Sequence, residues 1–235
     1  MKPVPEALHA SAIKASTGIA GFDEITGGGL PRGRTTLLVG GPGSGKTIFA
    51  LQFLVNGAQQ QEPGIFVAFE EASDRIQANF ESFDWEFKEL IPRELFFLDA
   101  QPPPGLVQSG TFDLGGMLAA LEMKVAEMGA QRIVFDALDI VLALLPDAAA
   151  QRREVYRLHD WLLARKLTGL ITAKAGGDET TSVGQQPFGF MQFMVDCAVI
   201  LNHSVVMGVS QRNVRVQKYR GSGFDENESP FVIGK

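Results

Sequence analysis

Cysteine is almost absent from this sequence, because Cys197 is the only one among 235 residues. An internal disulfide is therefore impossible, and the apolar run 197–201 around Cys197 predicts a small buried side chain. Histidine is scarce as well, since only His9, His159 and His203 occur, scattered along the chain. With a single cysteine they form no recognisable set of metal ligands of the zinc-site kind.

Long hydrophobic runs and an excess of positive charge are also missing. No apolar stretch approaches the ~20 residues that a membrane-spanning helix needs, and the N-terminus lacks the charged-then-apolar pattern of a signal peptide. Lys and Arg number 21 against 27 Asp and Glu, which gives a net charge of −6. This balance argues against nucleic acid or a membrane as the partner. Because a signal peptide and a membrane-spanning run are both missing, we expect a cytoplasmic protein.

A glycine-rich octapeptide carries the strongest functional signal in the chain. It matches the phosphate-binding pattern G-x-x-x-x-G-K-[ST] at every required position. Its members are Gly40, Gly41, Pro42, Gly43, Ser44, Gly45, Lys46 and Thr47. The apolar run 35–39 before it predicts a buried strand and the run 47–55 after it predicts a helix, which is the setting that the pattern requires.

Each residue type in this loop suits the binding of a nucleoside triphosphate with Mg²⁺. Gly43 and Gly45 allow positive φ, so backbone N–H groups can turn inward and form an anion cradle with the helix N-terminus. Lys46 can reach the β- and γ-phosphates, and the Thr47 hydroxyl can bind Mg²⁺. Ile48, next in the helix, joins the expected nucleotide contacts. The loop by itself would suit a kinase, a GTPase or a motor equally.

Alternating apolar strands and amphipathic helices predict an α/β fold with a mostly parallel central sheet flanked by helices. Further strands are expected at 64–69, 95–99, 132–136 and 170–173, and further helices at 73–83, 113–128 and 151–166. Near the C-terminus, the segments 197–202, 204–209 and 213–219 look like antiparallel edge strands, with a turn at 210–212. Residues 1–16 are expected to form a tail or arm, and residues 17–235 a single domain.

Three acidic residues stand at the expected carboxyl ends of strands, where ligands of such sheets bind. Asp136 closes the apolar run 133–135, as the acid of a Walker B strand does, and could hold Mg²⁺. Otherwise it is a turn-forming residue. Glu70 and Glu71 close another strand, and a carboxylate there could polarise an attacking water. The alternative is that both merely complement the N-terminus of the following helix.

These parts together resemble a KaiC-type ATPase domain of the RecA superfamily, which is a P-loop NTPase fold. The resemblance spans nearly the whole chain in order and spacing. The matching stretches are Gly18-Ile19-Ala20-Gly21-Phe22-Asp23, Gly27-Gly28-Gly29-Leu30-Pro31-Arg32-Gly33, the octapeptide, Phe69-Glu70-Glu71, Asp136 and Lys218-Tyr219-Arg220-Gly221-Ser222.

The resemblance implies a ring-shaped homohexamer that hydrolyses Mg²⁺-ATP between its subunits, with a KaiB-like protein as a further partner. It gives Glu70 and Glu71 the activation of water, and it places Ser82 near the nucleotide. It also implies that the late edge strand reaches the ATP of the neighbouring subunit, with Arg220 acting like an arginine finger. The implied contacts there are Lys218, Tyr219, Arg220 and Ser222. From the sequence alone, Lys218 and Arg220 would be ordinary exposed strand charges.

The chain also departs from the family's clock proteins, which carry two such domains and autophosphorylate in the second. Here there is one domain, and the segment 191–195, where the phosphate acceptor would fall, contains no Ser or Thr. The chain therefore resembles the first, hydrolytic domain, and a Ser/Thr autokinase is an alternative only for a longer parent chain. Whether this chain is a single-domain member or a fragment stays open at this point.

Two further hypotheses compete with the ATPase. One is a DNA-dependent recombinase relative, in which the apolar cluster at 188–194 would stack bases. The acidic balance and the Gly- and Gln-rich loop 175–187 argue against it, and core or subunit interface is the expected place of that cluster. The other is an assembly module in which ATP chiefly holds a ring together.

Overall fold

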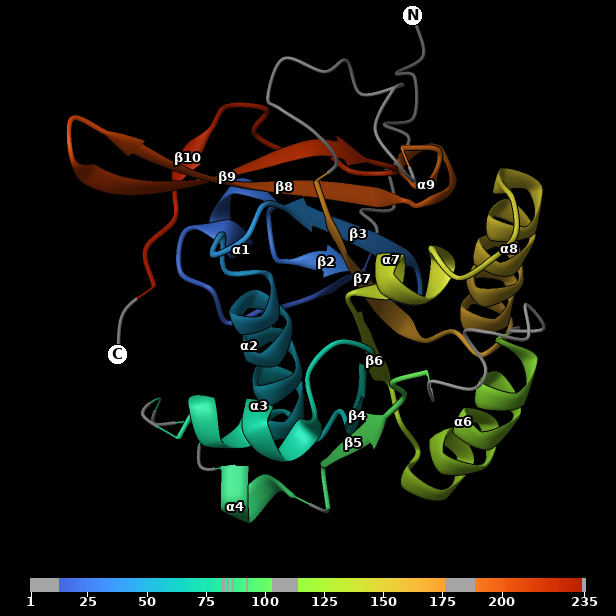
Figure 1. The fold of residues 1–235 in the computed structure, drawn as a ribbon. Coiled ribbons are helices and arrows are strands. Elements are labelled where there is room, and N and C mark those ends of the chain that lie inside the picture. The colour runs from blue at the N-terminus through green and yellow to red at the C-terminus, as the bar shows by residue number, and fades with distance from the viewer. Residues whose placement is uncertain are drawn as a thin grey trace, which may run out of the picture.

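The computed structural model describes residues 13–81, 83, 85, 87–91, 93–102, 114–175 and 189–233. Its centre is an eight-stranded sheet in the order β10-β9-β8-β3-β7-β6-β4-β5 (Figure 1). The six strands from β8 to β5 are mutually parallel, whereas β9 and β10 run antiparallel at one edge. This confirms the expected α/β, RecA-like P-loop fold with antiparallel edge strands from the C-terminal part of the chain.

Strands β8 and β9 are the longest of the sheet, whereas β10 at its antiparallel edge has only two residues. They are β3 (Thr35–Gly40), β4 (Gly64–Ala68), β5 (Leu95–Asp99), β6 (Arg132–Asp136), β7 (Thr168–Lys174), β8 (Cys197–Val206), β9 (Val209–Tyr219) and β10 (Ser229–Pro230). Strands β3, β4 and β6 are buried along their whole length, as expected for parallel strands covered on both faces. A separate two-stranded sheet joins β1 (Lys14–Ala15) to β2 (Leu30–Pro31).

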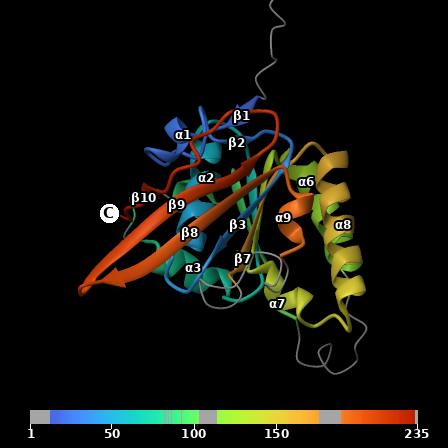
Figure 2. The same ribbon diagram turned by 90° about the horizontal axis from the view of Figure 1, so that it is seen from above.

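Helices cover both faces of the sheet (Figure 2). One face packs against α1 (Phe22–Ile25), α2 (Lys46–Gln59), α3 (Ser73–Asn79) and α4 (Phe87–Leu90). The other packs against α6 (Gly115–Met128), α7 (Leu138–Leu142), α8 (Ala148–Ala164) and α9 (Met191–Met194). Successive side chains of β3 enter opposite cores, since Leu38 belongs to the first cluster and Leu37 to the second. No helix among the described residues is both long and apolar enough to cross a bilayer.

The antiparallel edge differs from the three short strands expected at 197–202, 204–209 and 213–219. It is one long hairpin in which β8 and β9 pair from Cys197–Tyr219 to Val206–Val209, with one shift of register between Ala198 and Val199. The turn lies at Met207 and Gly208, which both have positive φ, and not at 210–212. The first segment, moreover, runs parallel to β3 and antiparallel only to β9. The polar residues at 210–212 reflect the exposure of the projecting hairpin, which Figure 2 shows clear of the body.

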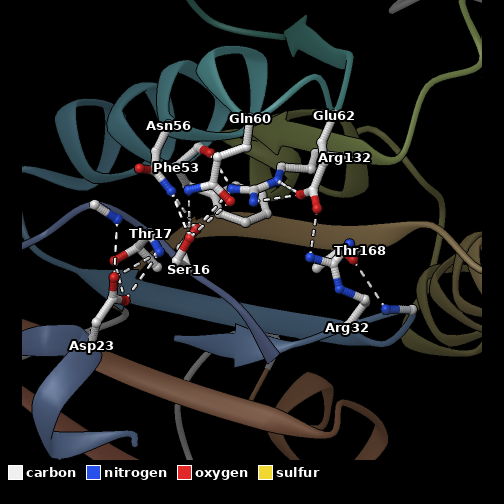
Figure 3. A network of polar contacts seen from close by, with 12 residues as sticks. Ser16, Thr17, Asp23, Arg32, Phe53, Asn56, Gln60, Glu62, Arg132 and Thr168 are labelled. Atoms are coloured by element: carbon white, nitrogen blue, oxygen red, sulfur yellow. Dashed lines mark hydrogen bonds and ion pairs between the residues drawn. The ribbon is translucent and has the colours of Figure 1, made fainter. Parts of the chain in front are cut away.

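Arg132, the first residue of β6, is wholly buried and ties the C-terminal half of α2 to the N-terminal segment (Figure 3). Its guanidinium donates to Glu62 at 2.8 and 2.5 Å, to the Ser16 carbonyl at 2.8 Å and to the Phe53 carbonyl at 2.7 Å. It also lies 4.7 Å from the centre of the Phe53 ring. Gly57 of α2 makes room for it, because a Cβ there would lie 2.4 Å from Arg132 Cδ.

The N-terminal segment is fixed at the same place. Asn56 donates to the Ser16 carbonyl at 2.9 Å, and Gln60 donates to the Ser16 hydroxyl at the same distance. Residues 14–16, which the sequence groups with the tail, therefore pack on the domain, and Ala15 is fully buried. The helix that follows the phosphate-binding loop is thereby anchored at its far end.

Candidate functional site

The glycine-rich loop joins β3 to α2 at the carboxyl edge of the sheet. Gly43 and Gly45 have φ of +70° and +101°, a region that side-chain-bearing residues rarely adopt. Gly45 is the N-cap of α2 and also makes room for the C-terminal segment, since a Cβ there would lie 2.8 Å from Ile233 Cδ1. The space beside Gly41 is open, because a Cβ atom added at this glycine would have no atom of a non-neighbouring residue within 4 Å. The loop therefore has the strand, turn and helix start that an anion cradle needs.

Lys46 lies over the loop with its ammonium directed at main-chain oxygens. Nζ donates to the Gly40 carbonyl at 2.8 Å and to the Gly41 carbonyl at 3.0 Å. Burial lowers the pKa of Lys46, although the charge of Asp136 opposes the shift. Among the described residues, no carboxylate forms an ion pair with it. A partly buried ammonium that bonds carbonyl oxygens is well suited to meet an incoming phosphate.

Thr47 and Asp136 meet across the start of α2 and the end of β6. The Thr47 hydroxyl donates to Asp136 Oδ2 at 3.1 Å. The Thr172 hydroxyl of β7 donates to the other carboxylate oxygen at 2.7 Å and accepts from the Ala137 N–H at 2.8 Å. Burial raises the pKa of Asp136, while the hydrogen bonds from Thr172 and Thr47 act against the rise. The two expected magnesium ligands therefore lie side by side, oriented by a third residue.

Glu70 and Glu71 point to different neighbours. Glu70 accepts from Lys174 Nζ at 2.8 Å, at the end of β7. Burial is the main cause of the pKa shifts of Lys46 and Asp136, but the charge of Glu70 acts on both groups. Glu71 instead accepts from Asn79 at 3.0 Å and lies 3.6 Å from Arg75, and both partners belong to α3. Glu70 is thus the acid that shares the electrostatic environment of the loop.

Lys218 and Arg220 lie at the opposite end of the sheet from the loop. The Arg220 N–H donates to the Asp196 carbonyl, and the Asp196 N–H donates to the Thr35 carbonyl at the start of β3. Gly40 lies five residue steps along β3 from Thr35, a rise of about 17 Å. Lys218 Nζ bonds the carbonyls of Gln192, Phe193 and Val195, and Arg220 bonds that of Phe193. Neither side chain is in a position to serve the loop of its own chain.

The other expected contacts are dispersed. Tyr219 is 6% exposed, and its hydroxyl donates to the Gly29 carbonyl at 3.0 Å, so its side chain is not available to a ligand. The Ser222 hydroxyl donates to the Gly223 carbonyl, near Arg220 in the chain. Ile48 lines a pocket beside the loop. Ser82 lies outside the described residues, as does the loop from 176 to 188 on which the DNA-binding hypothesis depends.

Three residues at the site did not emerge from the sequence. Thr172 orients Asp136, Lys174 holds Glu70, and Arg212 of β9 donates from Nε to the Gly43 carbonyl at 2.9 Å. Thr172 left a signal, because it is a polar residue within the apolar run 170–173. Arg212 left none, because its approach to the loop depends on the length of the hairpin.

The residues present fit a magnesium–nucleoside triphosphate complex. The positive-φ glycines and the open space at Gly41 leave room for phosphate against main-chain N–H groups. Lys46 supplies the cation, while Thr47 and Asp136 supply adjacent oxygen ligands of the kind that Mg²⁺ takes together with phosphate oxygens.

Comparison with known proteins points in the same direction. The family model "ATPase: KaiC" matches residues 15–235. The circadian clock protein KaiC2 of Synechocystis sp. is 37% identical over 226 residues, which are 95% of this chain and 39% of the relative. The circadian clock oscillator protein KaiC of Thermosynechococcus vestitus is 39% identical over 231 residues, 97% of this chain and 44% of the relative. The chain thus spans about two fifths of the length of these relatives.

Proposed function

The chain belongs to the KaiC family of ATPase domains, and from that premise we propose that it hydrolyses Mg²⁺-ATP at the subunit interfaces of a homohexameric ring. The observation that carries the proposal is the separation between the loop and Arg220. Half of the proposed site lies at one end of the sheet and half at the other. In a head-to-tail ring these two ends of neighbouring subunits face each other, and each interface then contains one complete site.

The proposed nucleotide-binding half comprises the loop 40–47 with Ile48. Backbone N–H groups of residues 43–47 bind the β-phosphate, and Lys46 exchanges its carbonyl partners for phosphate oxygens. Thr47 and Asp136 would hold Mg²⁺, and the ion would supply positive charge against the charge that develops on the phosphates. Thr172 keeps the carboxylate of Asp136 turned toward Thr47. Ser82 belongs to this half as an expected contact of the nucleotide.

Glu70 is the proposed base. Its carboxylate orients a water and accepts its proton as the water oxygen attacks the γ-phosphorus and the bond to the leaving ADP breaks. Lys174 holds the carboxylate in place from the end of β7. Glu71, engaged by α3, supports the position of that helix. Arg220 of the neighbouring subunit stabilises the charge on the transferred phosphoryl group. It is assisted by Lys218, Ser222 and the main chain at Tyr219 of the same subunit.

Single replacements should separate the two glutamates. We expect Glu70→Gln to lower kcat by about 10²-fold or more, the usual contribution of a general base, with ATP binding retained. Glu71→Gln, which leaves the contacts of Glu70 intact, should lower kcat by less than about tenfold.

Lys46→Ala should abolish hydrolysis through lost phosphate binding. Steady-state phosphate release and equilibrium ATP binding are the measurements, and unchanged turnover in both Lys46→Ala and Glu70→Gln would refute the site.

Removing the hydroxyl behind Asp136 should change the pH dependence of hydrolysis. Burial raises the pKa of Asp136 and Thr172 acts against the rise, so Thr172→Val should raise that pKa further. The acidic limb of the kcat profile should therefore move to higher pH. Thr172→Ser, which keeps the hydroxyl, is the control, and an equal shift in both variants would contradict this role.

The biological setting is part of the proposal. We take residues 17–235 as one ATPase domain, preceded by an arm, acting in the cytoplasm. The named relatives are circadian clock proteins, so we propose that hydrolysis drives a shape change that a KaiB-like partner reads in a clock or stress pathway. The test is co-elution of the ring with such a partner in the presence of ATP but not of ADP.

A further inference from the structure

A pocket of about 490 Å³ opens beside the phosphate-binding loop, and its two sides differ in chemistry. One side is the loop and the start of α2, from Gly43 to Ile48. The other side is formed by Phe80, Ile233 and Arg212, which come from three segments far apart in the chain. Phosphates belong on the first side, so the rest of the nucleotide has to lie against the second.

Phe80 is an aromatic residue that lines this pocket. It follows the last residue of α3, and its N–H donates to the Gln77 carbonyl at 3.2 Å, which fixes the main chain there. Its ring stacks on Trp85, with the centroids 5.9 Å apart and the planes 25° from parallel, and it also contacts Phe83 at 5.6 Å. The ring is only partly buried, and it lines the pocket. The ring thus packs on Trp85 and also borders the pocket.

Ile233 and Arg212 give the pocket its remaining walls. Ile233 packs on the start of α2, with its Cδ1 at 2.8 Å from the place of a Cβ on Gly45. Arg212 is held beside the loop by the hydrogen bond that its Nε donates to the Gly43 carbonyl. An aromatic face with an aliphatic side chain and a fixed guanidinium nearby suits a flat heteroaromatic ring that carries phosphates.

We propose that Phe80 is the residue that binds the nucleobase, by extending the stack of Trp85 and Phe80 with the base of the nucleotide. This inference rests on the proposed function, because it requires the phosphates to lie on residues 43–47. It assigns Phe80 to affinity for the nucleoside part and leaves phosphate binding to the loop. Stacking of a base on an aromatic side chain is strong enough for its loss to be measured.

The test compares a ligand that has a base with one that has none. Binding of ATP and of inorganic tripolyphosphate to the full chain is measured by calorimetry with Mg²⁺ present, for the wild type, Phe80→Ala and Phe80→Trp. Met123→Ala is the control, because Met123 is an exposed apolar side chain of α6, which packs on the face of the sheet opposite to α2. Far-ultraviolet circular dichroism establishes that each variant is folded.

We expect Phe80→Ala to weaken ATP binding by about tenfold, Phe80→Trp to retain it, and tripolyphosphate to bind all four proteins equally. Equal weakening of ATP and tripolyphosphate in Phe80→Ala would mean that Phe80 only supports the loop, and would overturn the inference. Unchanged ATP binding in Phe80→Ala would overturn it as well, while leaving the proposed function intact. If the wild type bound neither ligand, both proposals would fall together.

Discussion

A mixture of two inactive variants should regain about a quarter of the wild-type ATPase activity. The first variant combines Glu70→Gln with Glu71→Gln and lacks the base in the nucleotide-binding half. The second, Arg220→Ala, lacks the arginine of the other half, and by itself it should lose about 10³-fold or more in kcat. After subunit exchange in equal amounts, about one interface in four joins an intact loop half to an intact Arg220. Such an interface has every group that hydrolysis needs.

Recovery of activity on mixing depends on the two halves belonging to different subunits. If Arg220 served its own loop, no mixed interface would be complete and the mixture would stay inactive. Phosphate release is followed over time after mixing, and native mass is measured in parallel to verify that rings form and exchange. Two preparations of the same variant, mixed in the same way, are the control. No recovery despite proven exchange would exclude the proposed interface site.

Replacing Arg132 by Ala should cost about 3–5 kcal/mol in the free energy of unfolding, because two main-chain carbonyls lose their donor and the Glu62 carboxylate keeps only the partly exposed Arg32. For a domain of this size the loss corresponds to a fall of about 10 °C in Tm. Four hydrogen bonds that join β6, α2 and the N-terminal segment disappear with the guanidinium (Figure 3). Differential scanning calorimetry measures the change. Arg34→Ala, which removes a half-exposed ion pair with Asp196, should cost under about 1 kcal/mol.

The contribution of Glu62 to the free energy of unfolding should depend on pH. Burial raises the pKa of Glu62, but hydrogen bonds from Arg32 and Arg132 outweigh burial and hold it below the ordinary value of 4.5. A carboxyl group whose pKa is depressed by folding stabilises the protein above its unfolded pKa, and that stability is lost as pH falls through the folded pKa. The difference in unfolding free energy between the wild type and Glu62→Gln should therefore be full at pH 7 and shrink below about pH 4.5. A difference that stays constant down to pH 3 would contradict this account.

Local sequence predicted those features that depend on neighbouring residues in the chain. The loop 40–47 is contiguous, so the residue types and their order were enough to identify it. Asp136 could be found because an acid that ends an apolar run stands at the carboxyl edge of a parallel sheet. The hairpin of β8 and β9 was divided wrongly, because the polar residues at 210–212 resemble a turn. They are polar because the hairpin projects into solvent.

Contacts between distant segments could not be read from the sequence. Thr172 is 36 residues from Asp136, and their bond exists only because β7 lies next to β6 in the sheet. Glu70 and Glu71 are adjacent in the chain, and only the direction of each side chain separates them. Arg132 begins a strand with a charge, and nothing in the sequence marks it as wholly buried.

The sequence by itself determined the family, the fold class and the position of the glycine-rich loop, because these follow from short motifs and from the spacing of apolar residues. Only the tertiary structure decided which glutamate faces the loop, which threonine orients Asp136, and that Arg220 lies at the far end of the sheet from the loop. The physical reason is that strand order and register bring together residues far apart in the chain. A motif carries no information about either.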